Sequence, residues 1–166
     1  TKPCNAKMRE GEIEIAKDRL VAVTPLGHRL VKKENITLRQ ILHYPLILYD
    51  LNCEVNNLLN EFFKLNEINI ESLKIKIRMP DVPSSITAVS EGLGLSFCPE
   101  IIAKKAKRAG LVDIIYIPNI ESAVYSICAL KGEATSNAIQ EFWRHLTTIS
   151  KTFKGKLPCI LKIIYP

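Results

Sequence analysis

The sequence predicts an α/β protein with a doubly wound, mostly parallel sheet. Residues 73–78 alternate apolar and basic side chains, which indicates a strand with one buried face. A short helix follows, and the apolar run at residues 93–97 indicates a buried strand. A strand, a helix and a strand in so few residues imply a parallel pair with a right-handed crossover. The same arrangement recurs at residues 46–62.

The boundaries of the central helix follow from its turn residues. Pro80 and Pro83 stop the preceding strand. Ser84 and Ser85 are good N-cap residues, and Gly92 is placed to end the helix in a left-handed conformation. Pro99 then starts another helix.

The amino-terminal part contains one clear strand. Residues 1–11 are polar and without periodicity, so a connection is expected, with a brief strand at Ile13 and Ile15. The apolar run 19–23 predicts the first secure strand. His28 follows in a turn without a nearby carboxylate or nucleophile, which favours a structural role over catalysis.

Two elements precede the central unit. Thr37 and Gln40 have the spacing of a capping box, so a short helix is expected that ends before Pro45. Residues 46–49 predict a short buried strand. Asp50 and Asn52 are then N-cap candidates for a helix whose apolar face comprises Val55, Leu58, Leu59 and Phe62.

The carboxy-terminal part alternates helices and strands. Residues 100–109 predict a basic helix, residues 111–117 a strand closed by Pro118, and residues 123–130 the last clear strand. A helix is expected after Thr135, with an apolar side formed by Ile139, Phe142, Trp143, Leu146 and Ile149. The tail, residues 151–166, is expected to form an edge strand of unassigned role.

Composition limits the possible functions. The chain has 166 residues, 47% of them apolar, which suffices for one domain or two small lobes. The net charge of +6 is compatible with an anionic ligand or a polyanionic partner. The densest basic cluster, at residues 104–108, falls in the last turns of a helix, which favours a solvated face over a nucleic-acid surface.

No cofactor, metal site or catalytic group is expected. The five cysteines are scattered and odd in number, as expected of reduced cytoplasmic thiols, and the three histidines are dispersed. Neither a phosphate-binding glycine loop nor a nucleophile elbow occurs in the sequence. No apolar run reaches the length of a membrane span, so we expect no membrane partner. The start at Thr1 indicates a piece of a longer protein, with a processed product as the alternative.

A binding site is expected where the parallel strands end, because ligands of open α/β sheets bind beyond the carboxyl ends of the strands. The polar residues there suit binding better than catalysis, although Asp50 itself opposes an anion and is also a candidate cap. The candidate ligand-binding residues are Tyr49, Asp50, Asn52, Pro80, Ser84, Ser85 and Cys98.

Four segments in register resemble the effector-binding domain of LysR-type transcriptional regulators. They are DRLVAVTPLGHRL at residues 18–30, ITLRQILHYPLILYD at 36–50, AVSEGLGLSFCPE at 88–100 and SNAIQEFWRHL at 136–146. The family usually has proline after the turn histidine, where this chain has Arg29.

The resemblance implies a periplasmic-binding-protein-like lobe with a partial second lobe. Residues 1–18 would be a connection, 19–115 the family's second lobe, 116–150 a return strand and helix of its first lobe, and 151–166 the tail. The family's DNA-binding helix-turn-helix and the first half of its effector domain would precede Thr1.

The resemblance also implies a function. The chain would sense an anionic small-molecule effector within a cytoplasmic homo-oligomer and would reach DNA only through the missing amino-terminal domain. An extracytoplasmic solute-binding protein of the same architecture is the alternative. An enzyme on this fold, a dehydratase or a deaminase, is a third class, which the absence of an acid–base pair disfavours.

Overall fold

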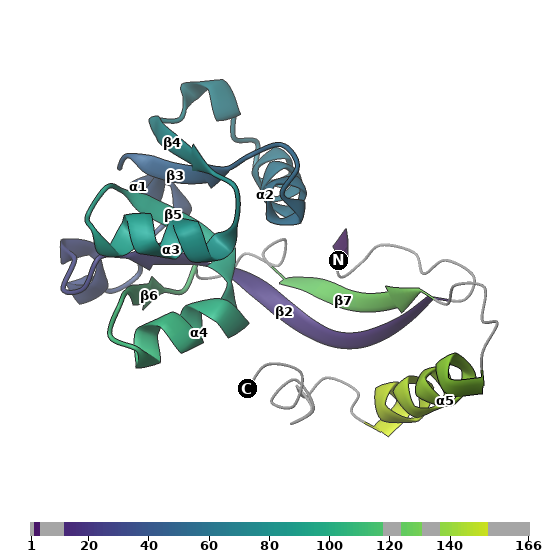
Figure 1. Cartoon of the computed structure of the whole chain (residues 1–166). Coiled ribbons are helices and arrows are strands. Elements are labelled where there is room, and N and C mark those ends of the chain that lie inside the picture. The colour runs from purple at the N-terminus through teal and green to yellow at the C-terminus, as the bar shows by residue number, and fades with distance from the viewer. Residues whose placement is uncertain (1, 4–11, 118–123, 131–136, 153–166) are drawn as a thin grey trace. The chain divides into compact units, whose positions relative to one another are not determined.

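The computed structural model describes residues 2–3, 12–117, 124–130 and 137–152 (Figure 1). The chain divides into two compact units. One contains Thr1–Asp18 and Val124–Pro166, and the other contains Arg19–Ala123. The long strand β2, Glu12–Thr24, contributes residues to both units.

The unit Arg19–Ala123 is built on a mixed sheet in the order β6, β2, β5, β3, β4. β3 pairs in parallel with both β4 and β5, whereas β2 pairs antiparallel with β5 and β6. The predicted α/β class with a mostly parallel sheet is therefore confirmed. Besides β2, the strands are β3 (Leu46–Tyr49), β4 (Ile75–Met79), β5 (Leu95–Pro99) and β6 (Asp113–Ile115).

Helices connect these strands. The short 3-10 helices are η1 (Arg29–Lys32) and η2 (Ile70–Ser72), and the α-helices are α1 (Leu38–Leu42), α2 (Glu54–Leu65), α3 (Val82–Ser90) and α4 (Glu100–Arg108). The predicted capping box starts α1, since Thr37 Oγ1 accepts from the Gln40 amide and Gln40 Oε1 accepts from the Thr37 amide. His28 has the expected structural role, because its Nδ1 accepts from the Leu30 amide at the start of η1.

The N-caps predicted for α2 and α3 are wrong. Asp81 caps α3 through a 2.7 Å hydrogen bond from the Ser84 amide to its Oδ1, so Ser84 and Ser85 lie inside the helix. Pro83 is accommodated in the first turn, where a helix needs no amide proton, and the helix can therefore begin earlier than the prolines suggested. At α2 the N-cap residue is Cys53, beyond Asp50 and Asn52.

The predicted end of α3 is confirmed. Gly92 has φ +76°, a left-handed conformation that costs glycine little. The Leu93 amide reaches the Ala88 carbonyl and the Gly92 amide reaches the Val89 carbonyl, which is the Schellman arrangement. The two bonds satisfy carbonyl groups that the last helical turn leaves free, and they redirect the chain into β5.

Two expectations about β4 are wrong. β4 and β5 do not pair with each other, because β3 lies between them. The face predicted to be buried is partly open, since Ile77 is 41% exposed. The reason is the sheet order, because β4 ends the strand path and has β3 as its one neighbour there.

The core of this unit surrounds β3 and β5. Every side chain of both strands is buried, and the rings of Phe62 and Phe63 from α2 lie 6.0 and 5.7 Å from that of Phe97 on β5. A buried chain of hydroxyls crosses this core. Ser85 Oγ on α3 donates to Ser96 Oγ at 2.8 Å, and Ser96 Oγ donates to the Ile47 carbonyl at 2.7 Å.

The other unit contains β1 (Lys2–Pro3), β7 (Val124–Leu130), α5 (Asn137–Thr152) and residues 12–18 of β2. β1 pairs antiparallel with β7. The strand and helix predicted for residues 123–130 and after Thr135 are confirmed, but Ile139 and Phe142 on the expected apolar side are 48% and 59% exposed. β2 starts at Glu12, so part of the segment expected to be a connection is strand. Pro118 and the tail from residue 153 lie outside the described residues.

The hydroxyl chain makes Ser96 a test of the core. Ser96→Ala removes the acceptor of Ser85 and the donor to Ile47, leaving buried polar groups without partners. We expect a loss of about 1–3 kcal/mol in the free energy of unfolding, measured by urea denaturation. Ser72→Ala is the control, because the Ser72 hydroxyl donates to a carbonyl at an exposed site. Equal losses in the two variants would show that the buried chain has no special role.

Candidate functional site

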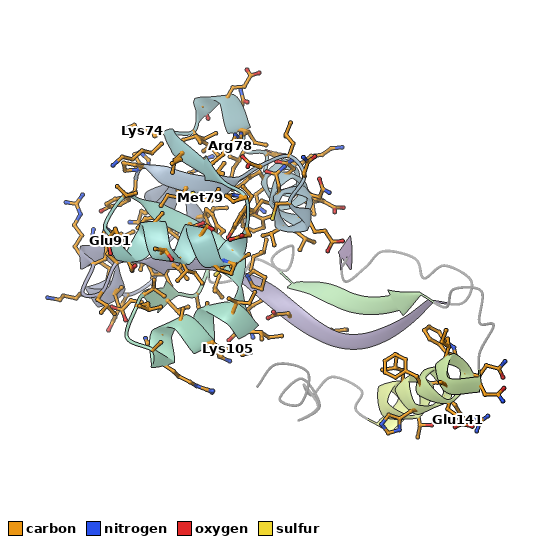
Figure 2. All side chains as sticks on the ribbon, viewed as in Figure 1. Lys74, Arg78, Met79, Glu91, Lys105 and Glu141 are labelled. Carbon is orange, nitrogen blue, oxygen red and sulfur yellow. The ribbon has the colours of Figure 1, made fainter. Side chains whose placement is uncertain are left out.

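The carboxyl ends of β3 and β4 are joined directly. Tyr49 is the register partner of Met79, and the Asp50 amide donates to the Met79 carbonyl at 3.0 Å. The polar segments that start at Asp50 and Pro80, 30 residues apart in the sequence, therefore begin side by side. Figure 2 shows Arg78 and Met79 at this end of β4.

Some of the predicted site residues are buried in the core next to this edge. Tyr49 is fully buried, and its hydroxyl donates to the Phe97 carbonyl at 2.9 Å, which ties the end of β3 to β5. Burial raises the pKa of Tyr49 far above its usual value, so the hydroxyl stays protonated. Cys98 and Ser85 are also buried, and Ser85 is engaged in the hydroxyl chain. These three side chains therefore belong to the core behind the edge and are not at its surface.

The remaining predicted residues lie at the surface of the edge. Asp50, Asn52 and Pro80 are exposed, and Ser84 is half-buried. The structure thus brings together the loop after β3 and the segment that leads into α3, while Tyr49 and Cys98 are buried near the ends of β3 and β5. Neither of two open surface cavities, with volumes of about 260 and 440 Å³, is lined by any predicted site residue.

The two helix N-termini at this edge differ in their free amides. At α3, the Asp81 carboxylate accepts from the Ser84 amide, and this backbone hydrogen bond lowers the pKa of Asp81. An anion there would have to displace a resident carboxylate. At α2, Cys53 makes no side-chain capping bond, although Glu54 stands in the first turn. Of the two, α2 therefore leaves more of its amides available.

Sequence reasoning missed Arg78 and Asp81 at this edge. Arg78 Nη1 donates to the Tyr49 carbonyl at 2.8 Å, which fixes a cation beside the end of β3. In the sequence, Arg78 was one of several basic residues in an alternating strand, with nothing to single it out. Asp81 had a recognisable signal, since an aspartate three residues before Ser84 is the usual spacing of a capping side chain.

The described residues offer no sign of two other kinds of site. Among them, no group of three or more His, Cys, Asp or Glu side chains is arranged to hold a metal ion. None of the helices in the described ranges is long and apolar enough to cross a membrane.

Comparison with known proteins identifies the family. Residues 11–150 match the family model described as the LysR substrate binding domain. The chain belongs to this family. The LysR domain is 34% identical over 140 residues to an uncharacterized HTH-type transcriptional regulator from Methanocaldococcus jannaschii, covering 81% of this chain and 46% of that protein.

A second curated relative matches at lower identity. A probable RuBisCO transcriptional regulator from Phaeodactylum tricornutum is 23% identical over 143 residues, covering 86% of the LysR domain and 47% of that protein. The chain thus spans about half the length of the curated relatives it matches.

The solved structures show the shared fold. The effector-binding domain of QuiR in complex with shikimate has a TM-score of 0.69 at 20% identity, covering 89% of this chain and 69% of that one. The Synechocystis CcmR regulatory domain in complex with 2-PG has a TM-score of 0.71 at 15% identity, covering 92% and 72%.

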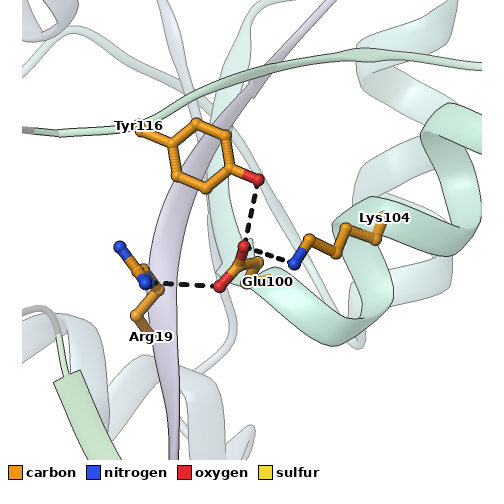
Figure 3. A network of polar contacts seen from close by, with 4 residues as sticks. All are labelled: Arg19, Glu100, Lys104 and Tyr116. Atoms are coloured by element: carbon orange, nitrogen blue, oxygen red, sulfur yellow. Dashed lines mark hydrogen bonds and ion pairs between the residues drawn. The ribbon is translucent and has the colours of Figure 1, made fainter.

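A second polar cluster of the LysR domain centres on Glu100, the first residue of α4 (Figure 3). Its carboxylate accepts from Lys104 Nζ at 2.7 Å, from the Tyr116 hydroxyl at 3.0 Å and from Arg19 Nε at 3.1 Å. The Arg19 guanidinium also lies 5.8 Å from the centre of the Tyr116 ring. Glu100 therefore joins the start of α4 to β2 and to the segment that follows β6.

The Glu100 cluster makes stability depend on pH. Burial raises the pKa of the Glu100 carboxyl, but hydrogen bonds from Lys104 and Tyr116 and the charges of Lys104 and Arg19 together outweigh it and leave the pKa below the usual value. A carboxyl whose pKa is lowered by folding stabilises the protein above its unfolded pKa. This contribution is lost as the pH falls through the folded pKa.

Glu100→Gln tests this cluster. Each ion pair with a partly exposed partner contributes about 0.2–1 kcal/mol, so we expect a loss of roughly 1 kcal/mol at neutral pH. The difference in the free energy of unfolding between the variant and the unmodified chain should shrink as the pH falls below about 4.5, the ordinary pKa of a glutamate carboxyl. Urea denaturation across this pH range measures it. Glu91→Gln, at an exposed position, is the control. A loss that does not change with pH would contradict the account.

Proposed function

We propose that this chain is the effector-sensing part of a LysR-type transcriptional regulator. The hydrogen bond between the Asp50 amide and the Met79 carbonyl carries the proposal, because it brings two polar segments together at one edge of a parallel sheet. The family match and the complexes of QuiR with shikimate and of CcmR with 2-PG support a small-molecule role for such domains.

The effector binds over the exposed part of this edge. Asp50, Asn52, Pro80 and Ser84 supply the contacts, with α2 offering amides at its N-terminus. Tyr49 and Ser85 act from the core, through hydrogen bonds that tie β3 and α3 to β5, and the buried Cys98 belongs to β5. The effector is anionic in this proposal, with Arg78, held beside the Tyr49 carbonyl, as its counter-charge, while Asp50 and Asp81 at the same edge oppose an anion.

The rest of the regulator lies outside this chain. Its relatives are about twice as long and are described as transcriptional regulators, which supports a DNA-binding segment elsewhere in a longer protein. Effector binding then alters the grip of a cytoplasmic homo-oligomer on DNA, which requires the effector to bind two states of the protein with different affinity. The domain binds its effector without turnover.

Thermal unfolding tests the effector site, with shikimate and 2-PG as the first probes. A ligand that binds the folded chain alone stabilises it by about 2.7 kcal/mol at a hundred times its Kd. The double variant Asn52→Ala with Ser84→Ala loses two polar contacts to the effector, so its Kd should rise by about tenfold or more. Ser85 is kept, since its hydroxyl serves the core.

Ser72→Ala is again the matched control, because this exposed serine lies in η2, outside the edge. It should leave the affinity of either probe unchanged. A metabolite that stabilises the doubly substituted chain as strongly as the unmodified chain would contradict the site. If neither probe binds, a panel of small carboxylates and phosphate esters is screened in the same assay, and failure of the whole panel would contradict the proposal.

A further inference from the structure

A basic cavity lies at the opposite edge of the sheet from the proposed effector site. Its volume is about 440 Å³, within the usual range for small-molecule sites. Pro45, part of its lining, directly precedes β3, and the Pro45 carbonyl accepts from the amide of Leu95, the first residue of β5. The cavity therefore sits at the amino ends of the parallel strands, beside η1 and α1. It is lined by Arg29, Leu30, Lys33, Gln40, His43, Tyr44 and Pro45.

The charged side chains that line this cavity are cationic. Among the described residues, Arg29 and Lys33 line it, and no carboxylate does. Within the described ranges, neither cation forms an ion pair with an acidic side chain, in contrast to Lys104 and Lys107, which do. Two cations facing one cavity without a counter-charge create a positive potential that an anion would relieve.

Arg29 is held in place for such a role. Its Nε donates to the Tyr44 hydroxyl, and its guanidinium lies 5.0 Å from the centre of the Tyr44 ring. The Tyr44 ring is itself packed edge-on against His28, with ring centres 4.9 Å apart. Burial, followed by the Arg29 charge, lowers the pKa of His28, so this imidazole adds no positive charge at neutral pH. The terminal nitrogens of Arg29 remain available as a planar pair of donors.

We propose that this cavity is a second ligand site, which binds a small organic anion through Arg29 and Lys33. A carboxylate or a phosphate group accepts from the guanidinium fork and from the Lys33 ammonium. The apolar body of the ligand packs against Tyr44 and Pro45. This site is separate from the edge at Asp50 and Ser84, so it does not depend on the proposed function.

Titration of the whole chain followed by amide NMR shifts tests the site. The probes are inorganic phosphate and benzoate, which separate the two anion chemistries, and benzamide is the neutral analogue of benzoate. Ionic strength is held constant, because exposed charges are screened by salt. We expect saturable shifts at Leu30, Lys33, Gln40, His43 and Tyr44 with at least one anion, and none with benzamide.

Variants separate a built site from diffuse attraction. Arg29→Gln and Lys33→Gln should each raise Kd by about tenfold, the usual loss of affinity when a charge-assisted hydrogen bond is removed. Lys32→Gln and Arg39→Gln are the matched controls, because both are exposed cations of η1 and α1 that do not line the cavity. They should change Kd by less than about twofold. Lys33→Gln stays informative if Arg29→Gln unfolds the chain, since the exposed Lys33 side chain makes no hydrogen bond or ion pair within the described ranges.

Several results would overturn the proposal. Equal weakening in all of these variants would mean general attraction to a basic surface. Saturable shifts confined to residues 50–54 and 81–85 would assign the anion to the other edge. The absence of a saturable shift with both phosphate and benzoate would remove the site altogether.

Discussion

The unit Arg19–Ala123 depends on the burial of β3 between two parallel neighbours. All of its side chains are buried, and both of its edges are used for hydrogen bonds, to β4 on one side and β5 on the other. A strand in this position needs apolar residues on both faces, which is why Leu46–Tyr49 is a continuous apolar run. Because β3 is fixed, the Tyr49 hydroxyl and the Asp50 amide reach the ends of β5 and β4.

The same arrangement gives the sheet two chemically different edges. The carboxyl edge carries exposed amide, hydroxyl and carboxylate groups, with Arg78 beside the Tyr49 carbonyl. The amino edge carries a cavity lined by cations without acidic partners among the described residues. Arg29 is one of these cations. The two proposed sites can therefore be tested separately, since a change at one edge leaves the side chains of the other in place.

Much of the backbone was predictable from local sequence, because its causes are local. The Thr37 capping box, the Gly92 turn and the strand at residues 46–49 each depend on a few neighbouring residues. The helix start at Asp81 was missed, since Pro83 looked like a barrier although the first turn accepts it. The start at Cys53 was missed because this residue makes no side-chain capping bond, whereas Asp50 and Asn52 are residue types that usually cap. The exposure of Ile77 and the burial of Ser85 follow from the order of strands, which no local pattern encodes.

Hydrogen–deuterium exchange of the chain, with and without a saturating effector found by the stability screen, tests the central claim most directly. We expect slower exchange at residues 51–56, where the N-terminal amides of α2 lie, and at residues 81–85 at the start of α3. Residues 29–45 should exchange at an unchanged rate. Protection confined to residues 29–45, with the ends of β3 and β4 unaffected, would contradict an effector site at the carboxyl edge.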